Sequence, residues 1–284
     1  MKTVNDFYDY KIMDMGNGKK LENWNGVLLS RPDPQIIWKT EEKDLWRNVH
    51  AEYNRSNTGG GKWNIFKDFN NVWQVKYRDM TFNVKLMNFK HTGLFPEQAY
   101  NWNFIREKLE GKNAKVLNLF AYTGASTVAS LKAGASVVHV DSSKGMTDWA
   151  KENVETNNLK DKPVRYIVED VVKFVKREIR RGNKYDAIIM DPPSFGKGKK
   201  QEIWKFEDNF YELLELVTEL LSDEAIFVLI STYTTGLSST IIENCLSKTV
   251  NKKISGTISS DEIGIVSENN LKLPCGIVTR WERN

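Results

Sequence analysis

Two short motifs in the second half of the chain combine residue types that can hold and present a ligand. Val116–Gly124 is an apolar run that ends in a turn, and Asp191-Pro192-Pro193-Ser194-Phe195 follows the apolar run Ala187–Met190. Between them, the apolar run Val137–Val140 ends in Asp141. The carboxyl ends of the strands in a doubly wound α/β sheet form one edge, where nucleoside-bearing ligands bind. The spacing therefore predicts a nucleoside site at that edge.

The turn after the first run holds a single glycine, and this count indicates which nucleoside fits. A dinucleotide needs the G-x-G-x-x-G pattern so that backbone amides can approach a pyrophosphate. Residues 121–126 supply only Gly124, which suits S-adenosylmethionine, an adenosine without phosphate. The sequence therefore predicts a methyltransferase, although single-glycine βα turns also occur as plain packing turns. The residues expected under the cofactor are Asn118, Phe120, Tyr122, Thr123, Gly124 and Ala125.

Two further carboxylates follow predicted strands. Asp141 can accept both ribose hydroxyls of an adenosine in a charge-assisted, bidentate contact. Its alternative role is a helix N-cap, which the following serines can also fill. Asp170 can accept from the adenine amino group while the amide of Val171 donates to the ring, and a helix N-cap is an equally open alternative. The expected adenosine contacts are therefore Asp141, Ser142, Asp170 and Val171.

The run from Asp191 to Phe195 is the most specific of these motifs. Its two prolines fix φ and remove two backbone donors, which leaves rigid carbonyls beside a carboxylate and an aromatic ring. Methyl transfer from a sulfonium is an in-line displacement, and alignment can supply about 7–11 kcal/mol of its barrier. A rigid acceptor loop can align a flat substrate ring, whereas a plain proline turn does not explain the combination. The expected catalytic residues are Asp191, Pro192, Pro193 and Phe195, with Asp191 also facing the cofactor.

Alternating strands and helices must position these motifs. Strands are predicted over 115–120, 136–140, 164–168, 187–190 and 226–231, with helices over 125–132, 144–157, 171–181, 205–221 and 238–249. Two more strands, near 254–258 and 276–281, close the chain. Right-handed crossovers make this a mostly parallel sheet with helices on both faces, a doubly wound α/β fold. We expect this domain to span residues 91–284.

The first 90 residues have a different pattern. Short strand-like runs are bounded by turns, and 72–77 and 80–86 alternate about a two-residue turn, which predicts a hairpin. A helical turn is expected near 41–50. We therefore expect a smaller, mainly antiparallel β domain over residues 1–90, followed by a joining helix over about 96–109.

Three segments of the chain resemble a known family. Leu117–Gly124, Asp191–Gly196 and His91–Gln98 are similar to the bacterial class I S-adenosylmethionine-dependent methyltransferases of the RlmI/RlmK-like group, which includes modifiers of large-subunit ribosomal RNA. The similarity covers roughly residues 86–284. The resemblance implies a seven-stranded Rossmann-like sheet with its last strand antiparallel, and an RNA substrate. It also implies cofactor contacts at Asn118 to Gly124, Asp141, Asp170, Asp191, Phe95 and Gln98.

Departures from the family pattern narrow the expected chemistry. Family members that methylate carbon-5 of cytosine carry a nucleophilic cysteine after the fifth strand, where this chain has Ile230-Ser-Thr-Tyr-Thr-Thr235. Carbon-5 becomes nucleophilic only after a thiolate adds to the ring, so methylation at a nitrogen is expected instead. The amino-terminal RNA-reading module of some relatives is not recognisable. Gly196–Lys200 with Lys205 form a basic segment that either follows phosphates or is a solvated loop.

Composition limits the class of protein. The 284 residues carry 41 basic and 37 acidic side chains, a net charge of +4 that favours a polyanionic partner only slightly. Two cysteines cannot form a disulfide framework or a four-ligand zinc site, and no metal is expected. The apolar runs are too short to cross a membrane and the amino terminus has no leader pattern, so we expect a cytoplasmic protein. The oligomeric state stays open, with a homodimer among the alternatives.

Two other functions stay open. The chain is either a methyltransferase for a small molecule or a protein instead of RNA, or a module that binds the cofactor or RNA without catalysis. Intact Asp141, Asp191, Pro192 and Pro193 argue against the second alternative.

Overall fold

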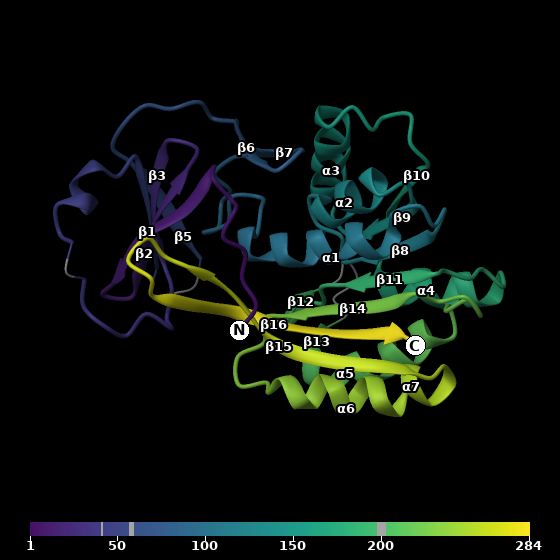
Figure 1. The fold of residues 1–284 in the computed structure, drawn as a ribbon. Helices are drawn as coiled ribbons and strands as arrows, with labels where there is room; N and C mark the ends of the chain where they lie inside the picture. The colour runs from purple at the N-terminus through teal and green to yellow at the C-terminus, as the bar shows by residue number, and fades with distance from the viewer. Residues whose placement is uncertain (41, 57–59, 198–202) are drawn as a thin grey trace. The chain divides into compact units, whose positions relative to one another are not determined.

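The computed structural model describes residues 1–284 except 41, 57–59 and 198–202. The chain forms two compact units, which are coloured along the sequence in Figure 1. The first comprises Met1–Tyr100 and Gly264–Cys275, and the second comprises Asn101–Ile263 and Gly276–Asn284. The chain passes from the first unit to the second inside helix α1 (Ala99–Leu109). None of the helices in the described part of the chain is long and apolar enough to cross a membrane.

A five-stranded sheet in the order β1-β2-β3-β4-β5 forms the centre of the first unit. Its strands are β1 (Tyr10–Gly16), β2 (Lys19–Trp24), β3 (Val27–Pro32), β4 (Ala51–Arg55) and β5 (Gly61–Ile65). All neighbours pair antiparallel except β3 and β4, which are parallel. The separate hairpin of β6 (Trp73–Tyr77) and β7 (Met80–Val84) confirms the hairpin that the sequence predicted. Two short 3-10 helices, η1 (Leu45–Asn48) and η2 (Pro96–Gln98), complete the unit.

The second unit contains a seven-stranded sheet in the order β10-β9-β8-β11-β14-β16-β15. Its strands are β8 (Lys115–Leu119), β9 (Ser136–Asp141), β10 (Val164–Val168), β11 (Ala187–Met190), β14 (Phe227–Thr232), β15 (Gly256–Val266) and β16 (Lys272–Arg283). Strands β10, β9, β8, β11 and β14 pair in parallel, whereas β16 runs antiparallel to β14. The predicted doubly wound sheet with an antiparallel last strand is therefore confirmed.

Helices cover both faces of this sheet (Figure 1). On one face α2 (Ala125–Lys132) packs against β8 and β9, and α3 (Lys144–Thr156) packs against β9 and β10. The other face is covered by α4 (Val171–Arg180), α5 (Phe206–Thr218), α6 (Ser239–Lys248) and α7 (Val250–Lys253). Side chains alternate between the two faces of a strand. Leu117 and Leu119 of β8 accordingly join Phe174 of α4 and Phe210 of α5 in one buried core.

Some element boundaries differ from those expected. Strands β15 and β16 are longer than the predicted strands at 254–258 and 276–281. The additional residues were not predicted, because they are mostly polar or partly exposed and give no apolar signal. Two strands that were not expected, β12 (Phe195–Lys197) and β13 (Ile203–Lys205), form a short hairpin after the proline loop. They are only three residues each, which is too short to show a period of two.

The order of strands reverses next to β8. From β8 the chain continues to β9 and β10 on one side, whereas β11 lies on its other side and leads to β14. Ligands of open α/β sheets bind at the carboxyl ends of the strands at such a switch point. Phe120 directly follows β8 and Asp191 directly follows β11, so the two sequence motifs flank this point.

Candidate active site

The turn after β8 has an unusual backbone. Phe120, Tyr122 and Gly124 have φ values of 55°, 50° and 83°, all in the left-handed region. Two of these residues carry side chains for which that region is costly, and such strain gathers at ligand sites. The amide of Ala121 donates to the Val140 carbonyl over 3.0 Å, and the amide of Gly124 donates to the Ala121 carbonyl over 3.0 Å. The protein itself therefore fixes the shape of the turn.

Gly124 is needed for its φ value and for its packing. A Cβ atom at this position would lie 2.8 Å from the Cβ of Ala150 on α3. On the same helix, the Asn153 side chain donates to the Thr123 carbonyl over 2.9 Å. Helix α3 therefore presses directly against the turn, so the packing role that the sequence left open for this glycine is observed.

Asp141 is the last residue of β9, and its carboxylate accepts hydrogen bonds from two backbone amides. Tyr122 donates to its Oδ2 over 2.9 Å and Ser143 donates to its Oδ1 over 2.8 Å. Burial raises the pKa of the Asp141 carboxyl, and these two donors oppose that shift. A carboxylate has about four acceptor positions, so capacity remains for a pair of hydroxyl donors. The N-cap of α3 is Ser143, whose hydroxyl accepts from the Met146 amide, while Ser142 is exposed beside Asp141.

Asp170 lies at a helix N-cap, which was the alternative role that the sequence left open for it. It is the N-cap of α4 and accepts from the Lys173 amide over 2.9 Å. Asp170 is exposed, whereas the next residue, Val171, is buried in the core. The contacts of Asp170 inside the protein are therefore those of a cap.

Asn118 belongs to a buried polar chain that sequence reasoning missed. Its side chain is 2 % exposed and donates to Thr127 Oγ1 over 3.0 Å, and Thr127 lies 3.0 Å from His139 Nδ1. The other ring nitrogen of His139 is buried and has no hydrogen-bond partner among the described residues. Burial lowers the pKa of His139 to about 3, so the imidazole is neutral. This series of hydrogen bonds joins β8, α2 and β9. The one feature of the sequence that could have indicated it is a histidine inside an apolar strand.

The proline loop is fastened at both of its ends. The amide of Asp191 donates to the Leu119 carbonyl of β8 over 3.4 Å. At the far end, the Ser194 carbonyl accepts from the Phe206 amide over 3.0 Å, and the Ser194 hydroxyl accepts from Thr234 over 3.0 Å. Within the loop Pro192 is buried and Pro193 is exposed, while the Phe195 side chain is 56 % exposed. The loop thus presents an aromatic face to solvent on a fixed backbone.

Trp204 connects the loop to the turn after β8. Its indole N–H donates to the Pro193 carbonyl over 2.6 Å, and its ring centre lies 5.6 Å from that of Phe120. One of the two proline-loop carbonyls is therefore already taken by the protein. Sequence reasoning missed this residue, because it lies on the three-residue strand β13.

The remaining expected residues belong to the first unit or to a basic segment that is described only in part. Phe95 and Gln98 belong to the first unit. The ring centres of Phe95 and His91 lie 5.3 Å apart, and Gln98 is buried. Of the predicted basic segment, residues 198–200 lie outside the described residues, and Lys205 is exposed.

The two cysteines belong to different units. Cys245 lies on α6, and Cys275 belongs to the first unit. Burial raises the pKa of both thiols, and it raises that of Cys275 strongly.

Comparisons with known proteins show the family to which the chain is similar. Residues 52–244 match the model of a family described as S-adenosylmethionine-dependent methyltransferase. The crystal structure of a SAM-dependent methyltransferase from Agrobacterium tumefaciens is 31 % identical, with a TM-score of 0.93, and the match covers 99 % of this chain and 93 % of that one.

Curated relatives add a second group of similar proteins. The ribosomal RNA large subunit methyltransferase K/L of Syntrophotalea carbinolica is 29 % identical over 182 residues, which cover 63 % of this chain and 25 % of the relative. The ribosomal RNA large subunit methyltransferase K of Neisseria meningitidis serogroup B is 31 % identical over 169 residues, which cover 59 % of this chain and 46 % of the relative. The chain thus spans less than half the length of both relatives.

Proposed function

This chain belongs to the S-adenosylmethionine-dependent methyltransferase family, and from that premise we propose that it transfers a methyl group to a base of RNA, ribosomal RNA being favoured. Two similar proteins are named as methyltransferases of large-subunit ribosomal RNA, which supports an RNA substrate. In this proposal residues 91–284 form the methyltransferase domain, residues 1–90 form a separate small domain, and the protein works in the cytoplasm.

The residues at the strand ends fit S-adenosylmethionine, which supplies an electrophilic methyl group when bound. Its ribose offers two hydroxyl donors, and the Asp141 carboxylate is a fixed acceptor with capacity for both. One tightly packed glycine, Gly124, leaves no glycine-rich loop of the kind a pyrophosphate requires. We assign adenosine to Asp141, Asp170 and the Val171 amide, with Ser142 beside them.

The rest of the cofactor is assigned to the turn after β8. Amides at the start of a helix favour a carboxylate, because their donors are not used inside the helix. We therefore place the methionine carboxylate near Ala125, where α2 begins. The further contacts proposed are Asn118, Phe120, Tyr122, Thr123, Gly124 and Asp191, together with Phe95 and Gln98 of the first unit.

The main observation that supports a substrate site is the loop from Asp191 to Phe195, which hydrogen bonds hold at both ends beside the turn after β8. Because Trp204 already occupies the Pro193 carbonyl, we assign the Asp191 carboxylate and the Pro192 carbonyl as acceptors for an exocyclic amino group. We assign the exposed ring of Phe195 as the face on which the base stacks.

Nitrogen is the atom that this site suits best. Strand β14 ends in Ser231 and Thr232, and no cysteine follows up to Thr235, so no thiolate is available there to activate carbon-5. An amino nitrogen needs no such adduct. Its lone pair forms the new bond to the methyl carbon as the bond to sulfur breaks, and its surplus proton passes to the Asp191 carboxylate.

The decisive experiment is to incubate the purified protein with isotopically labelled S-adenosylmethionine and total cellular RNA, and then to identify the labelled nucleoside by mass spectrometry. We expect label on a nitrogen of a base in ribosomal RNA. Label in protein or small molecules, with none in RNA, would support the first alternative function. Cofactor binding without transfer to any of these would support a non-catalytic module.

A further inference from the structure

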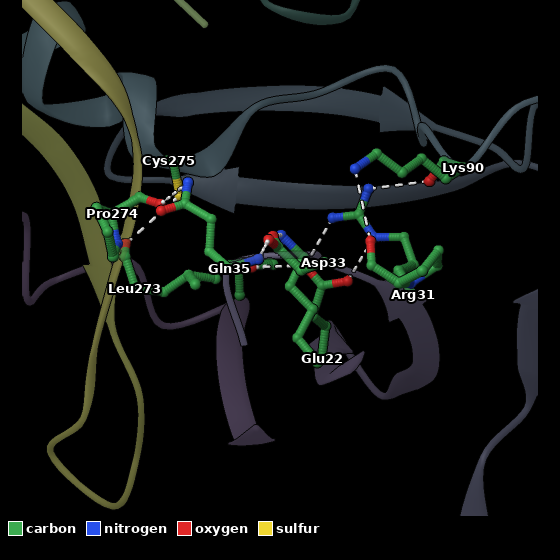
Figure 2. Close-up of polar contacts among 11 residues, drawn as sticks. Glu22, Arg31, Asp33, Gln35, Lys90, Leu273, Pro274 and Cys275 are labelled. Carbon is green, nitrogen blue, oxygen red and sulfur yellow. Dashed lines mark hydrogen bonds and ion pairs between the residues drawn. The ribbon is translucent and has the colours of Figure 1, made fainter. Parts of the chain in front are cut away.

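The first unit contains a cluster of cationic side chains built around a buried ion pair (Figure 2). Arg31 donates twice to Glu22, from Nε over 2.5 Å and from Nη2 over 2.6 Å. Tyr10 donates to the same carboxylate over 2.7 Å. Glu22 is fully buried and its acceptor positions are largely filled by these donors. The carboxylate is therefore committed to the interior of the unit.

Lys90 lies at the edge of this cluster. Its Nζ donates to the Pro32 carbonyl over 3.5 Å, and its own carbonyl accepts from Arg31 Nη1 over 3.1 Å (Figure 2). Nearby, Lys20 forms an ion pair with Asp33 at 3.3 Å. Arg55, at the end of β4, is exposed.

Two titratable groups show that the surroundings of Lys90 are positive. Burial and the cations Lys20, Arg31 and Arg55 lower the pKa of the Lys90 ammonium to about 8, with Asp33 opposing them. Burial and the same cations, with Lys90 itself, lower the pKa of His91 to about 4. Glu97 is a further carboxylate that acts on Arg31.

An exposed aromatic residue neighbours Lys90 in the sequence. Phe89 is 60 % exposed and directly precedes Lys90. Its backbone is held by Trp63 of β5, whose indole N–H lies 2.9 Å from the Met87 carbonyl and 3.1 Å from the Phe89 carbonyl. Trp63 in turn pairs with Tyr53 of β4, and β4 ends at Arg55. The backbone that carries the exposed ring is therefore held by hydrogen bonds to β5.

We propose that Arg55, Phe89 and Lys90, together with the partly buried Lys20, form a docking surface on the first unit for single-stranded RNA. The proposal rests on the proposed function. Single-stranded nucleic acid is bound by cations that follow the phosphates and by aromatic rings on which bases stack. A phosphate between Lys90 and Arg55 relieves the repulsion among the cations. An acidic protein partner would use the charges but would have no need of the exposed Phe89 ring.

The test measures binding of a fluorescent single-stranded RNA of mixed sequence by anisotropy, over a series of salt concentrations. Each phosphate contact contributes about 0.7 to the slope of log K against log salt for single strands. We expect the Arg55→Ala/Lys90→Ala double variant to lower that slope by about 1.4 and to weaken binding at least about tenfold at low salt. The matched control, Lys43→Ala/Lys76→Ala, removes the same charge from exposed positions of the first unit and leaves the slope as in the wild type.

The aromatic part of the surface is tested separately. Phe89→Ala should weaken RNA binding about tenfold without changing the salt slope, since stacking carries no charge. Tyr8→Ala, at a position 78 % exposed in the same unit, is its control and binds like the wild type. If Phe89→Ala also binds like the wild type, the surface attracts anions by charge alone and the proposal fails.

Methylation assays separate this proposal from the proposed function. We expect the double variant to raise KM for RNA while kcat and the affinity for S-adenosylmethionine stay unchanged. If the wild type methylates RNA but the double variant binds and methylates equally well, the docking surface is wrong and the proposed function stands. If the wild type neither binds nor methylates RNA, both fail.

Discussion

The backbone amide of Tyr122 donates to the Asp141 carboxylate over 2.9 Å, so the turn after β8 and the end of β9 hold each other in place. The other oxygen of the same carboxylate accepts from Ser143 at the start of α3. One side chain thus sets the geometry of two neighbouring strand ends. A residue in this position affects ligand binding both directly, as an acceptor, and indirectly, through the shape of the turn.

Replacing Asp141 should weaken cofactor binding. We expect Asp141→Ala to lower the affinity for S-adenosylmethionine by about 1–3 kcal/mol, the usual cost of removing one partner from a buried charged hydrogen bond. Asp141→Asn keeps one acceptor oxygen and should lose less. Asp148→Ala on α3 removes a carboxylate that forms ion pairs with Lys144 and Lys151, and serves as the control. Isothermal titration calorimetry measures all three, and an unchanged affinity for Asp141→Ala would remove this residue from the site.

Gly124 allows a prediction that separates backbone strain from packing. Gly134 has a similar φ of 88°, but a Cβ atom there meets nothing within 4 Å, whereas at Gly124 it would lie 2.8 Å from Ala150. Gly134→Ala should therefore cost only the left-handed strain, about 1–2 kcal/mol. Gly124→Ala should cost a further 1–3 kcal/mol, roughly, from overpacking. Urea denaturation gives both values, and equal losses would show that α3 yields at the contact.

Much of the second unit could be predicted because its central strands β8, β9, β11 and β14 are buried on both faces. Runs such as Ala187–Met190 are continuously apolar, and each polar side chain that ends a run marks the carboxyl edge of the sheet. Strand β15 could not be predicted over its full length, since it alternates exposed and partly buried positions along its first half. Its polar residues look like a loop until β16 is known to lie beside it.

The site was predictable only in part, for a different reason. The positions of Asp141 and Asp191 follow from the ends of apolar strands. The roles of Thr127, His139 and Trp204 depend on contacts between elements, such as the 2.6 Å hydrogen bond from Trp204 to Pro193. No local spacing encodes such a contact. Asn118 shows the same limit, because the hydrogen bond of its side chain to Thr127 cannot be read from its strand position.

Trp204 should be a positioning residue for methyl transfer. Trp204→Phe keeps a ring beside Phe120 but removes the donor to the Pro193 carbonyl. Loss of one hydrogen bond is worth about 0.5–1.5 kcal/mol, so we expect kcat to fall about two- to tenfold. The affinity for S-adenosylmethionine should stay unchanged, because Asp141 is untouched. A merely structural role would instead lower the melting temperature and leave kcat of the folded enzyme as in the wild type.

His139 should make the protein less stable in mild acid. Its pKa is about 3 in the folded protein, compared with the ordinary 6.5, because it is buried. The unfolded chain therefore binds a proton below pH 6.5 that the folded protein does not bind until about pH 3, so stability falls as the pH is lowered through that window. This single group should cost about 2 kcal/mol between about pH 7 and pH 5.

The histidine effect is measured by urea denaturation at several pH values. His91 has a pKa lowered to about 4 and acts in the same direction, so the wild type should show the sum of both groups. His139→Asn should remove one group's share of the pH dependence whatever it does to the stability at neutral pH. A variant with the same pH dependence as the wild type would mean that His139 is protonated inside the fold.

The strongest test of the site is Asp191→Ala. The amide of Asp191, not its side chain, makes the hydrogen bond to Leu119 that fastens the loop to β8, so the substitution should leave that contact and the fold intact. We expect methyl transfer to be abolished while the melting temperature changes little. Asp223→Ala removes an exposed carboxylate before β14 and should retain full activity. Normal turnover by folded Asp191→Ala protein would contradict the assignment of Asp191 as the acceptor for the substrate amino group, and the proline loop would then have to act through Pro192 and Phe195 alone.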